Sequence, residues 1–172
     1  DRETNRKALE ELASSYKEKA ENLMIVDLLR NDLGKNCEFG SVKVTKLFDI
    51  ETFANVHHLV STVQGKILNT SDIFKLIKGC FPGGSITGAP KIRAMQIINE
   101  LEPDNRGVYC GSIGYISSNG NTDLNIAIRT VAATNDKLFF WGGGGIVYDS
   151  EVESEYKETF DKIKPLLKIF EN

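Results

Sequence analysis

Hydrophobic residues in the first third of the chain recur with a helical period and then with a strand period. Between about 4 and 33, apolar side chains return every three or four residues, at Leu9, Leu12, Tyr16, Ala20, Leu23 and Met24. Gly34 follows in the position of a C-cap. Alternating polarity then predicts strands over 41–50 and 56–68, and the second of these places His57 and His58 on opposite faces.

The second half of the chain changes from helical to strand-like patterns. Ser71 is placed to cap a short helix over 72–78, and a second helix, ending near residue 100, follows a glycine-rich run at 81–91. Strand-like runs cover 107–117, 122–134 and 137–147, and turn residues at 118–121 and 135–136 separate them. These runs predict an antiparallel meander, followed by a closing helix over 150–170. The pattern as a whole predicts one α+β domain, largely antiparallel, with helices packed on the outside.

Composition narrows the class of protein. The chain has 172 residues, of which 41% are hydrophobic and 26% charged, and its net charge of -3 gives no nucleic-acid footprint. Apolar runs are too short to cross a membrane, and the polar start at 1–7 is unlike a signal peptide. Cys37, Cys80 and Cys110 lack CxxC spacing, which favours a reducing cytoplasm over a disulfide scaffold or a zinc site.

The glycine-rich run at 81–91 (FPGGSITGAPK) is the first candidate for chemistry. A glycine-rich loop that opens a helix presents free backbone N–H groups, which suit an anion. An ordinary loop-to-helix junction is the alternative. A phosphate-binding P-loop is excluded because Ala89 and Pro90 separate Gly88 from Lys91.

Two pairs of glutamates form the second candidate. Glu18 and Glu21, and likewise Glu155 and Glu158, are three residues apart, so each pair shares a helical face. Four carboxylates brought together would suit Mg²⁺. The alternative is a solvated helix face with surface ion pairs to nearby lysines.

Three further features suggest a binding site. His58 lies on a partly apolar strand face and is either structural or a proton carrier. Arg129 alternates with apolar residues in a predicted strand and is either a partner in a sheet ion pair or a clamp for a carboxylate. Four glycines at 142–145 end a predicted strand, which weakens a sheet unless something approaches the backbone closely. Together these features indicate a site for a small polyanion with Mg²⁺.

Seven stretches, in order along nearly the whole chain, resemble the chorismate-utilising enzymes. They are 21–32 (ENLMIVDLLRND), 58–61 (HLVS), 85–91 (SITGAPK), 111–115 (GSIGY), 128–130 (IRT), 143–147 (GGGIV) and 154–159 (SEYKET). The resemblance implies the chorismate-binding fold, also found in anthranilate synthase component I. It also implies that Glu21 and Glu158 coordinate Mg²⁺, that Glu18 and Glu155 support the ion directly or through water, and that the ion holds the ring carboxylate of chorismate.

The same resemblance implies the rest of the site. The enolpyruvyl carboxylate of chorismate would be held by Tyr109, Arg129 and the backbone N–H groups of Gly143 and Gly145, with Lys162 facing the same anion. Ser85 and Thr87 would line the ring pocket. The implied catalytic residues are His58, which would assist proton transfer, Thr87 and Lys162.

The run at 81–88 (FPGGSITG) resembles one branch of the family, whereas anthranilate synthases look more like GTLSG in the slot at 84–88. That branch converts chorismate and ammonia into 4-amino-4-deoxychorismate, on the way to para-aminobenzoate and folate, and a glutamine amidotransferase partner supplies the ammonia. The alternatives are an anthranilate or isochorismate synthase, and a non-catalytic module that binds chorismate and Mg²⁺ or pairs with another chain.

One departure from that branch concerns its Pro-Ile-Lys-Gly-Thr motif, whose lysine forms a covalent adduct with the ring. The motif does not occur within the 172 residues. We expect it upstream of Asp1, so that residues 1–172 are the C-terminal portion of a chorismate-binding domain and are inactive, or nearly so, alone. A sheet cut in this way has unpaired edges, which predicts self-association of the fragment.

Overall fold

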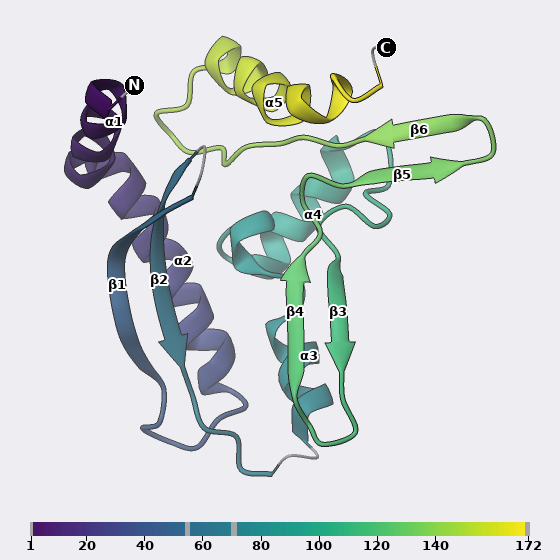
Figure 1. The fold of residues 1–172 in the computed structure, drawn as a ribbon. Helices are drawn as coiled ribbons and strands as arrows, with labels where there is room; N and C mark the ends of the chain where they lie inside the picture. The colour runs from purple at the N-terminus through teal and green to yellow at the C-terminus, as the bar shows by residue number, and fades with distance from the viewer. Residues whose placement is uncertain (1, 54–55, 70–71, 171–172) are drawn as a thin grey trace. The chain divides into compact units, whose positions relative to one another are not determined.

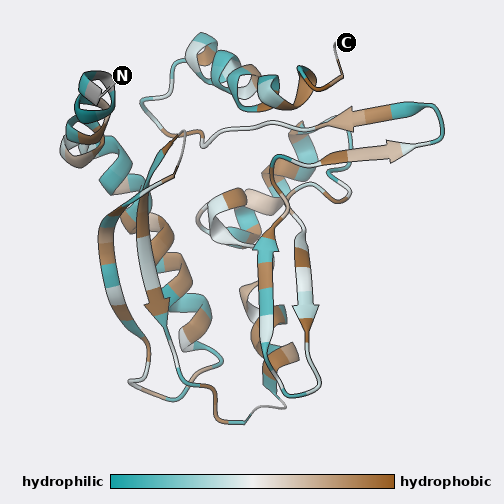
Figure 2. Cartoon of the chain, in the orientation of Figure 1, coloured by the Kyte–Doolittle hydropathy of each residue, from teal (hydrophilic) through white to brown (hydrophobic). Residues whose placement is uncertain are grey.

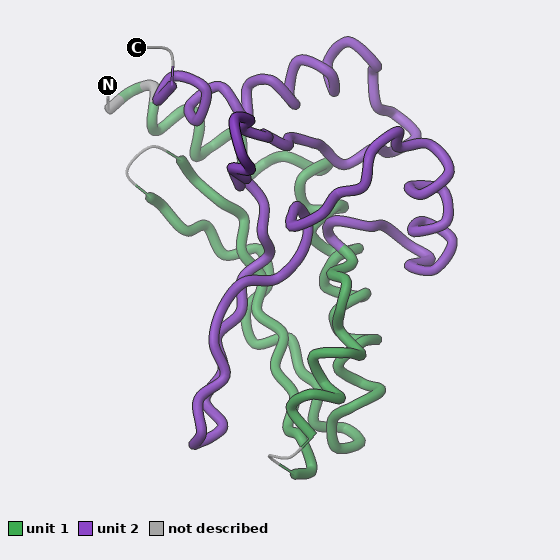
Figure 3. The backbone as a smooth tube through the Cα atoms, turned by 90° about the vertical axis from the view of Figure 1, so that its right-hand side faces the viewer, with its two compact units in different colours: residues 1–84 green, residues 85–172 purple. Residues whose placement is uncertain are grey.

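The computed structural model describes residues 2–53, 56–69 and 72–170 (Figure 1). It divides the chain into two compact units, residues 1–84 and residues 85–172 (Figure 3). In the first unit, two helices, α1 (Arg2–Ser14) and α2 (Tyr16–Gly34), precede an antiparallel pair, β1 (Lys43–Thr52) and β2 (His57–Gln64), and a short helix, α3 (Ile73–Cys80). Ser71, the predicted cap of that short helix, lies outside the described residues.

The prediction of a single helix over 4–33 is wrong at Ser15, which separates α1 from α2. Its backbone is extended (φ -64°, ψ 112°), and its Oγ accepts a hydrogen bond of 3.2 Å from the backbone N–H of Glu18. Serine followed three residues later by glutamate is the sequence signature of a helix N-terminus, so a new helix begins here. The apolar period continues across the junction and conceals it.

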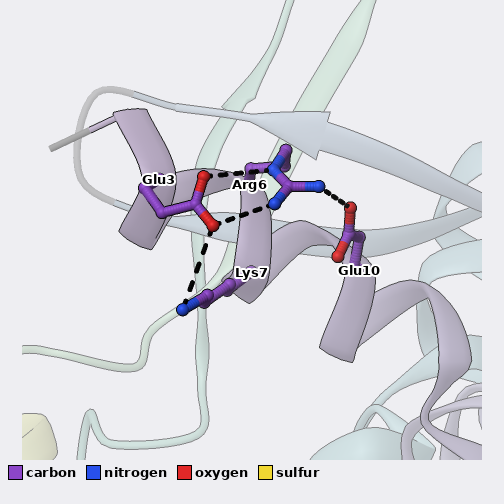
Figure 4. Close-up of polar contacts among 4 residues, drawn as sticks. All are labelled: Glu3, Arg6, Lys7 and Glu10. Atoms are coloured by element: carbon purple, nitrogen blue, oxygen red, sulfur yellow. Dashed lines mark hydrogen bonds and ion pairs between the residues drawn. The ribbon is translucent and has the colours of Figure 1, made fainter.

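Helix α1 is largely hydrophilic and is laced by surface ion pairs. Arg6 reaches Glu3 at 2.9 Å on one side and Glu10 at 3.0 Å on the other (Figure 4). All three side chains are more than half exposed. Such pairs contribute little to stability in water. Hydrophobic residues concentrate instead in α2, β1 and β2 (Figure 2), where Val26 is 3% exposed.

Helix α2 is fastened to the β1–β2 pair by a polar chain that begins at Asn22. Its side-chain amide donates to the Leu59 carbonyl at 3.0 Å and its Oδ1 accepts from the Ser61 hydroxyl at 2.6 Å. The Ser61 Oγ accepts in turn from the backbone N–H of Phe48 at 3.0 Å. Phe48 has φ 60° and sits where the β1–β2 register shifts. The hydroxyl thus satisfies an N–H group that the irregular ladder leaves over.

The second unit begins beside a single 3₁₀ turn, η2 (Gly84–Ile86), and continues with α4 (Lys91–Leu101), β3 (Ser112–Ile116), β4 (Thr122–Ile126), β5 (Val131–Thr134), β6 (Lys137–Phe140) and α5 (Val152–Leu167). Both predicted hairpin turns are confirmed. The continuous meander is wrong, because β3–β4 and β5–β6 are separate two-stranded sheets.

The predicted strand over 122–134 breaks after β4. The Ile128 N–H donates back to the Ile126 carbonyl at 2.9 Å, and Arg129 follows with φ 52°. Ala127, between β4 and this turn, pairs with residues 110–111, which precede β3. The Cys110 N–H donates to the Ala127 carbonyl, and the Ala127 N–H donates to the Gly111 carbonyl, both at 2.9 Å. Ala127 and Cys110 are the buried hydrophobic residues described in this unit.

The strand predicted over 137–147 is also too long, since β6 ends at Phe140 and the glycine run at 142–145 is irregular. The α+β class with antiparallel strands is confirmed. No helix among the described residues is long and apolar enough to cross a membrane.

Candidate functional site

The glycine run lies against residues that the sequence singles out. A Cβ added at Gly143 would stand 2.8 Å from the Tyr109 hydroxyl oxygen, and one added at Gly144 would stand 3.0 Å from Oε2 of Glu155. Real Cβ atoms essentially never approach another heavy atom more closely than 3.0 Å. At Gly142, Gly143 and Gly144, atoms of other segments come close to the backbone, which is the kind of approach that a glycine run allows.

Helix α5 presents three charged side chains to this run. Glu155 Oε1 accepts from the Ser150 hydroxyl at 2.7 Å, whereas its buried Oε2 has no hydrogen-bond partner among the described residues. Glu158 forms an ion pair with Lys162, one turn further along. Lys162 Nζ also donates to the Gly143 carbonyl at 3.1 Å. The predicted helical spacing of these residues is confirmed, and it brings them to one short segment of backbone.

The two carboxylates fit a divalent cation in part. A Cβ at Gly144 would lie 3.0 Å from a Glu155 oxygen and 3.7 Å from a Glu158 oxygen, so both carboxylates reach the same glycine. An unpaired buried carboxylate oxygen is costly unless a donor or cation satisfies it. Oxygen ligands of this type suit Mg²⁺. The described residues contain no group of three or more metal-ligating side chains.

Tyr109 is held by aromatic and cationic neighbours. Its ring stacks on Trp141, with centroids 6.3 Å apart and planes at 7°, and the Arg106 guanidinium lies 5.8 Å from the ring centroid. Burial raises the pKa of Tyr109, so the phenol stays protonated and able to donate near neutral pH. Tyr109 lies in the turn before β3, not within the strand predicted over 107–117.

Arg129 is exposed and adopts a left-handed backbone conformation, which is uncommon for a residue with a side chain. It follows Ala127 by two residues, and Ala127 pairs with Cys110 next to Tyr109. The backbone pairing therefore brings the Tyr109 and Arg129 segments side by side. Strain of this kind is commonly retained where a side chain has to be aimed.

In the glycine-rich loop, Ser85 lies within η2 and Thr87 follows it directly. Ser85 is exposed and Thr87 half-buried, and the Ile86 carbonyl between them accepts a hydrogen bond of 2.9 Å from Arg106. Gly88 has φ 117°, a conformation that glycine supplies without strain. Pro90 then takes the N-cap position of α4.

The remaining predicted residues belong to the first unit. Glu18 and Glu21 lie in the early turns of α2, where a carboxylate also complements the helix dipole. His58 is exposed, pairs across the sheet with Glu51 and packs edge-on against Phe53 at 5.7 Å.

His57, on the opposite face of β2, is the more restrained histidine. Its two ring nitrogens lie 2.9 Å from the Thr52 hydroxyl and 2.7 Å from Oδ1 of Asn5. Thr52 and Asn5 thus restrain the His57 ring at both nitrogens. His58 is the histidine to which the family resemblance assigns proton transfer.

Comparison with known proteins places the chain. The family model for chorismate binding enzymes matches residues 1–168. The chain belongs to the chorismate-binding enzyme family. It is 54% identical over its whole length to aminodeoxychorismate synthase component 1 of Salmonella typhimurium, covering 38% of that protein. It is 47% identical to anthranilate synthase component 1 of Aquifex aeolicus over 98% of the chain and 34% of that protein.

A solved structure shares the fold. The crystal structure of anthranilate synthase component I from Streptococcus pneumoniae matches 94% of the chain and 37% of its own length, with a TM-score of 0.87 and 47% identity. The expected chorismate-binding fold is therefore confirmed. The chain spans little more than a third of the length of these relatives.

Sequence reasoning missed three residues that organise the family's stretches. Asn22 links the stretch at 21–32 to the stretch at 58–61, Ser150 holds Glu155, and Arg106 joins the glycine-rich loop to Tyr109. Asn22 and Ser61 lie within two of the seven stretches that resemble the family, and this position was the only sign of their importance in the sequence. Arg106 and Ser150 lie outside every quoted stretch, and their partners are brought close only by the fold.

Proposed function

We propose that this chain is part of an enzyme that converts chorismate and ammonia into 4-amino-4-deoxychorismate, the precursor of para-aminobenzoate in folate synthesis. The observation that carries the proposal is its 54% identity, over the whole chain, to a protein named aminodeoxychorismate synthase component 1. Because the chain covers 38% of that relative, the activity is a proposal for the whole natural protein.

The site chemistry supports an anionic substrate. Chorismate carries two carboxylates, and each needs a cation or a set of donors. In the proposal, the Tyr109 hydroxyl, the Arg129 guanidinium and the N–H groups of Gly143 and Gly145 bind the enolpyruvyl carboxylate. Lys162, already hydrogen-bonded to the Gly143 carbonyl, adds positive charge beside them. A protonated phenol and a guanidinium fork are strong donors to a carboxylate.

Around the ring, we assign Ser85 and Thr87 to the pocket wall and His58 to proton transfer. These three assignments rest on the resemblance to the family. His58 suits its assignment because histidine is the side chain that enzymes use most often to transfer a proton.

The proposed metal is Mg²⁺, with Glu155 and Glu158 among its ligands. The support is the approach of both carboxylates to Gly144, and the buried Oε2 of Glu155, which has no hydrogen-bond partner in the described ranges. Glu18 and Glu21 are proposed ligands on the family resemblance alone. When bound, the ion would neutralise the ring carboxylate and withdraw charge from the ring hydroxyl, which makes that hydroxyl a better leaving group.

The proposed partner is a glutamine amidotransferase that supplies ammonia, and the name component 1 of the relative supports a second component. A cytoplasmic location is proposed because the three cysteines are odd in number and lack the spacing of a disulfide scaffold or a metal site. The two-stranded sheets have unpaired edges, so we also propose that the isolated chain self-associates.

Anthranilate synthesis is the main alternative, and the 47% identity to the Aquifex protein favours it among the other reactions of the family. Product analysis separates the two. The natural protein is incubated with chorismate, ammonium ions and Mg²⁺, and the product is identified by mass and absorbance. We expect 4-amino-4-deoxychorismate; anthranilate or isochorismate would overturn the assignment.

A non-catalytic module is the remaining alternative. It predicts calorimetric binding of chorismate with Mg²⁺ but no turnover by the natural protein. A separate expectation concerns residues 1–172 alone, which should show almost no turnover with ammonium ions. Substantial turnover by that isolated chain would contradict the expectation that a further lysine motif is needed.

A further inference from the structure

Arg106 connects several parts of the second unit that the proposed function uses separately. Its Nε and Nη2 donate to the two carboxylate oxygens of Glu102, at 2.8 and 2.6 Å. Its Nη1 donates to the Ile86 carbonyl at 2.9 Å, and the guanidinium carbon lies 5.8 Å from the centroid of the Tyr109 ring. One planar group therefore contacts the end of α4, the glycine-rich loop and a substrate-binding aromatic residue.

This arrangement differs from an ordinary surface ion pair. The Arg106 side chain is 25% exposed. By contrast, the side chain of Arg93, which pairs with Glu100 within α4, is 57% exposed. The bidentate pair with Glu102 fixes the plane of the guanidinium, and a fixed plane is needed to lie against a ring and donate elsewhere at once. The hydrogen bonds to Glu102 also raise the pKa of Arg106, which keeps it cationic.

We propose that Arg106 is a positioning residue that sets the place of the Tyr109 phenol and of the Ser85–Thr87 segment for chorismate binding. It acts on the substrate through those residues. On one side, the bond to the Ile86 carbonyl holds the backbone between the two hydroxyl residues. On the other, the ring of Tyr109 contacts both Arg106 and Trp141, and its hydroxyl oxygen lies beside Gly143.

The inference rests on the proposed chorismate site, and it predicts a defect in binding. If Tyr109 grips a carboxylate in both the ground state and the transition state, a misplaced phenol weakens both equally. Such a loss raises KM and leaves kcat nearly unchanged. Losing the ring contact and one charge-assisted hydrogen bond should raise the KM for chorismate about tenfold.

The test compares R106Q, R106K and the control R93Q in the natural protein. R106Q should show the tenfold rise in KM with kcat within about twofold. R106K should fail to restore KM, because an ammonium group cannot fill the bidentate, backbone and ring contacts together. R93Q removes an exposed guanidinium from α4 and should leave both constants unchanged.

A spectroscopic measurement is independent of the substrate. Trp141 is the single tryptophan of the 172 residues, and it stacks on Tyr109. The near-ultraviolet circular dichroism of Trp141, assigned by subtraction of the W141F spectrum, should change in R106Q and R106K but not in R93Q. Far-ultraviolet spectra and thermal unfolding check the fold, and R106K serves if R106Q does not fold.

The results distinguish failure of the proposed function from failure of the positioning role of Arg106. If the unsubstituted protein binds no chorismate, the proposed function fails, while the Trp141 signal still tests positioning. If it binds chorismate, a KM for R106Q within about twofold of the unsubstituted value overturns the positioning role. Full restoration by R106K would also overturn it, because a positive charge alone would then suffice. An unchanged Trp141 signal in R106Q contradicts the contact with Tyr109.

Discussion

Replacing Gly143 with alanine should damage substrate binding far more than folding. The added Cβ would stand 2.8 Å from the Tyr109 hydroxyl oxygen, and the next described atom outside the two adjacent residues is Cζ of the same ring, at 4.0 Å. Gly143 has no left-handed φ, so alanine can adopt its backbone conformation. The whole conflict is therefore with the end of one side chain, and the phenol can relieve it by moving a few tenths of an ångström or more.

The magnitude follows from the proposed role of the phenol, a hydrogen bond to a carboxylate of chorismate. Moving it out of line would cost a hydrogen bond to a charged group, about 1.5–3 kcal/mol. That loss corresponds to an increase of about 10- to 150-fold in the dissociation constant for chorismate. Calorimetric titration with chorismate, in the presence of Mg²⁺, measures it directly in the natural protein.

Gly142→Ala is the matched control, since it makes the same change one residue earlier. There the new Cβ would stand 2.8 Å from the Thr159 carbonyl oxygen and 2.8 Å from Cγ2 of Ile163. Backbone cannot move aside as a side-chain end can, so the cost of overpacking, about 1–3 kcal/mol, falls on the free energy of unfolding. If Gly143→Ala binds chorismate with unchanged affinity, the assignment of the Tyr109 hydroxyl to the substrate is wrong.

Three further predictions follow from single contacts. Glu158→Gln should abolish Mg²⁺-dependent chorismate binding with the fold intact; calorimetric binding that survives at moderate Mg²⁺ would refute its role as a direct ligand. Ser15→Ala should lower the free energy of unfolding by about 1 kcal/mol through loss of the α2 cap, whereas Ser14→Ala, the control inside α1, should change it little; equal effects on thermal unfolding would contradict the capping role. Asn22→Ala should cost about 1–3 kcal/mol because it removes both hydrogen bonds between α2 and β2; an unchanged denaturation midpoint would argue against that link.

Helices and strands in which hydrophobic residues recur at regular spacing were predictable from the sequence. The points at which these elements break were not. The α+β class, the two hairpin turns and the closing helix follow from residue patterns that the fold obeys. The helix break at Ser15 was missed because the apolar spacing runs through it, although serine and glutamate marked the new start. The strand break near Arg129 had no comparable signal, since Leu124, Ile126 and Ile128 keep alternating past the point where the backbone turns.

Some features of the candidate site could likewise be predicted from the sequence, and others could not. Residue types and spacing were enough to single out the two glutamate pairs and the glycine run, but they could not rank Glu155 and Glu158 above Glu18 and Glu21. Contacts between segments could not be read from the chain, since Arg106 gains its partners from a loop 20 residues earlier and a ring three residues later. The roles given to Ser85 and Thr87 came from resemblance alone.

The two glutamate pairs show why spacing is weak evidence for a metal site. Both pairs have the same three-residue separation on a helix, yet their surroundings differ. Glu18 stands in the first turn of α2, where a capping serine and the helix dipole already favour an acidic residue. Glu155 has a buried oxygen for which the described part of the chain offers no hydrogen-bond partner, and it faces Gly144, which has no side chain to fill the space beside it. The unsatisfied oxygen is an observation that spacing alone does not supply, so the proposal of Mg²⁺ rests more on Glu155 and Glu158 than on Glu18 and Glu21.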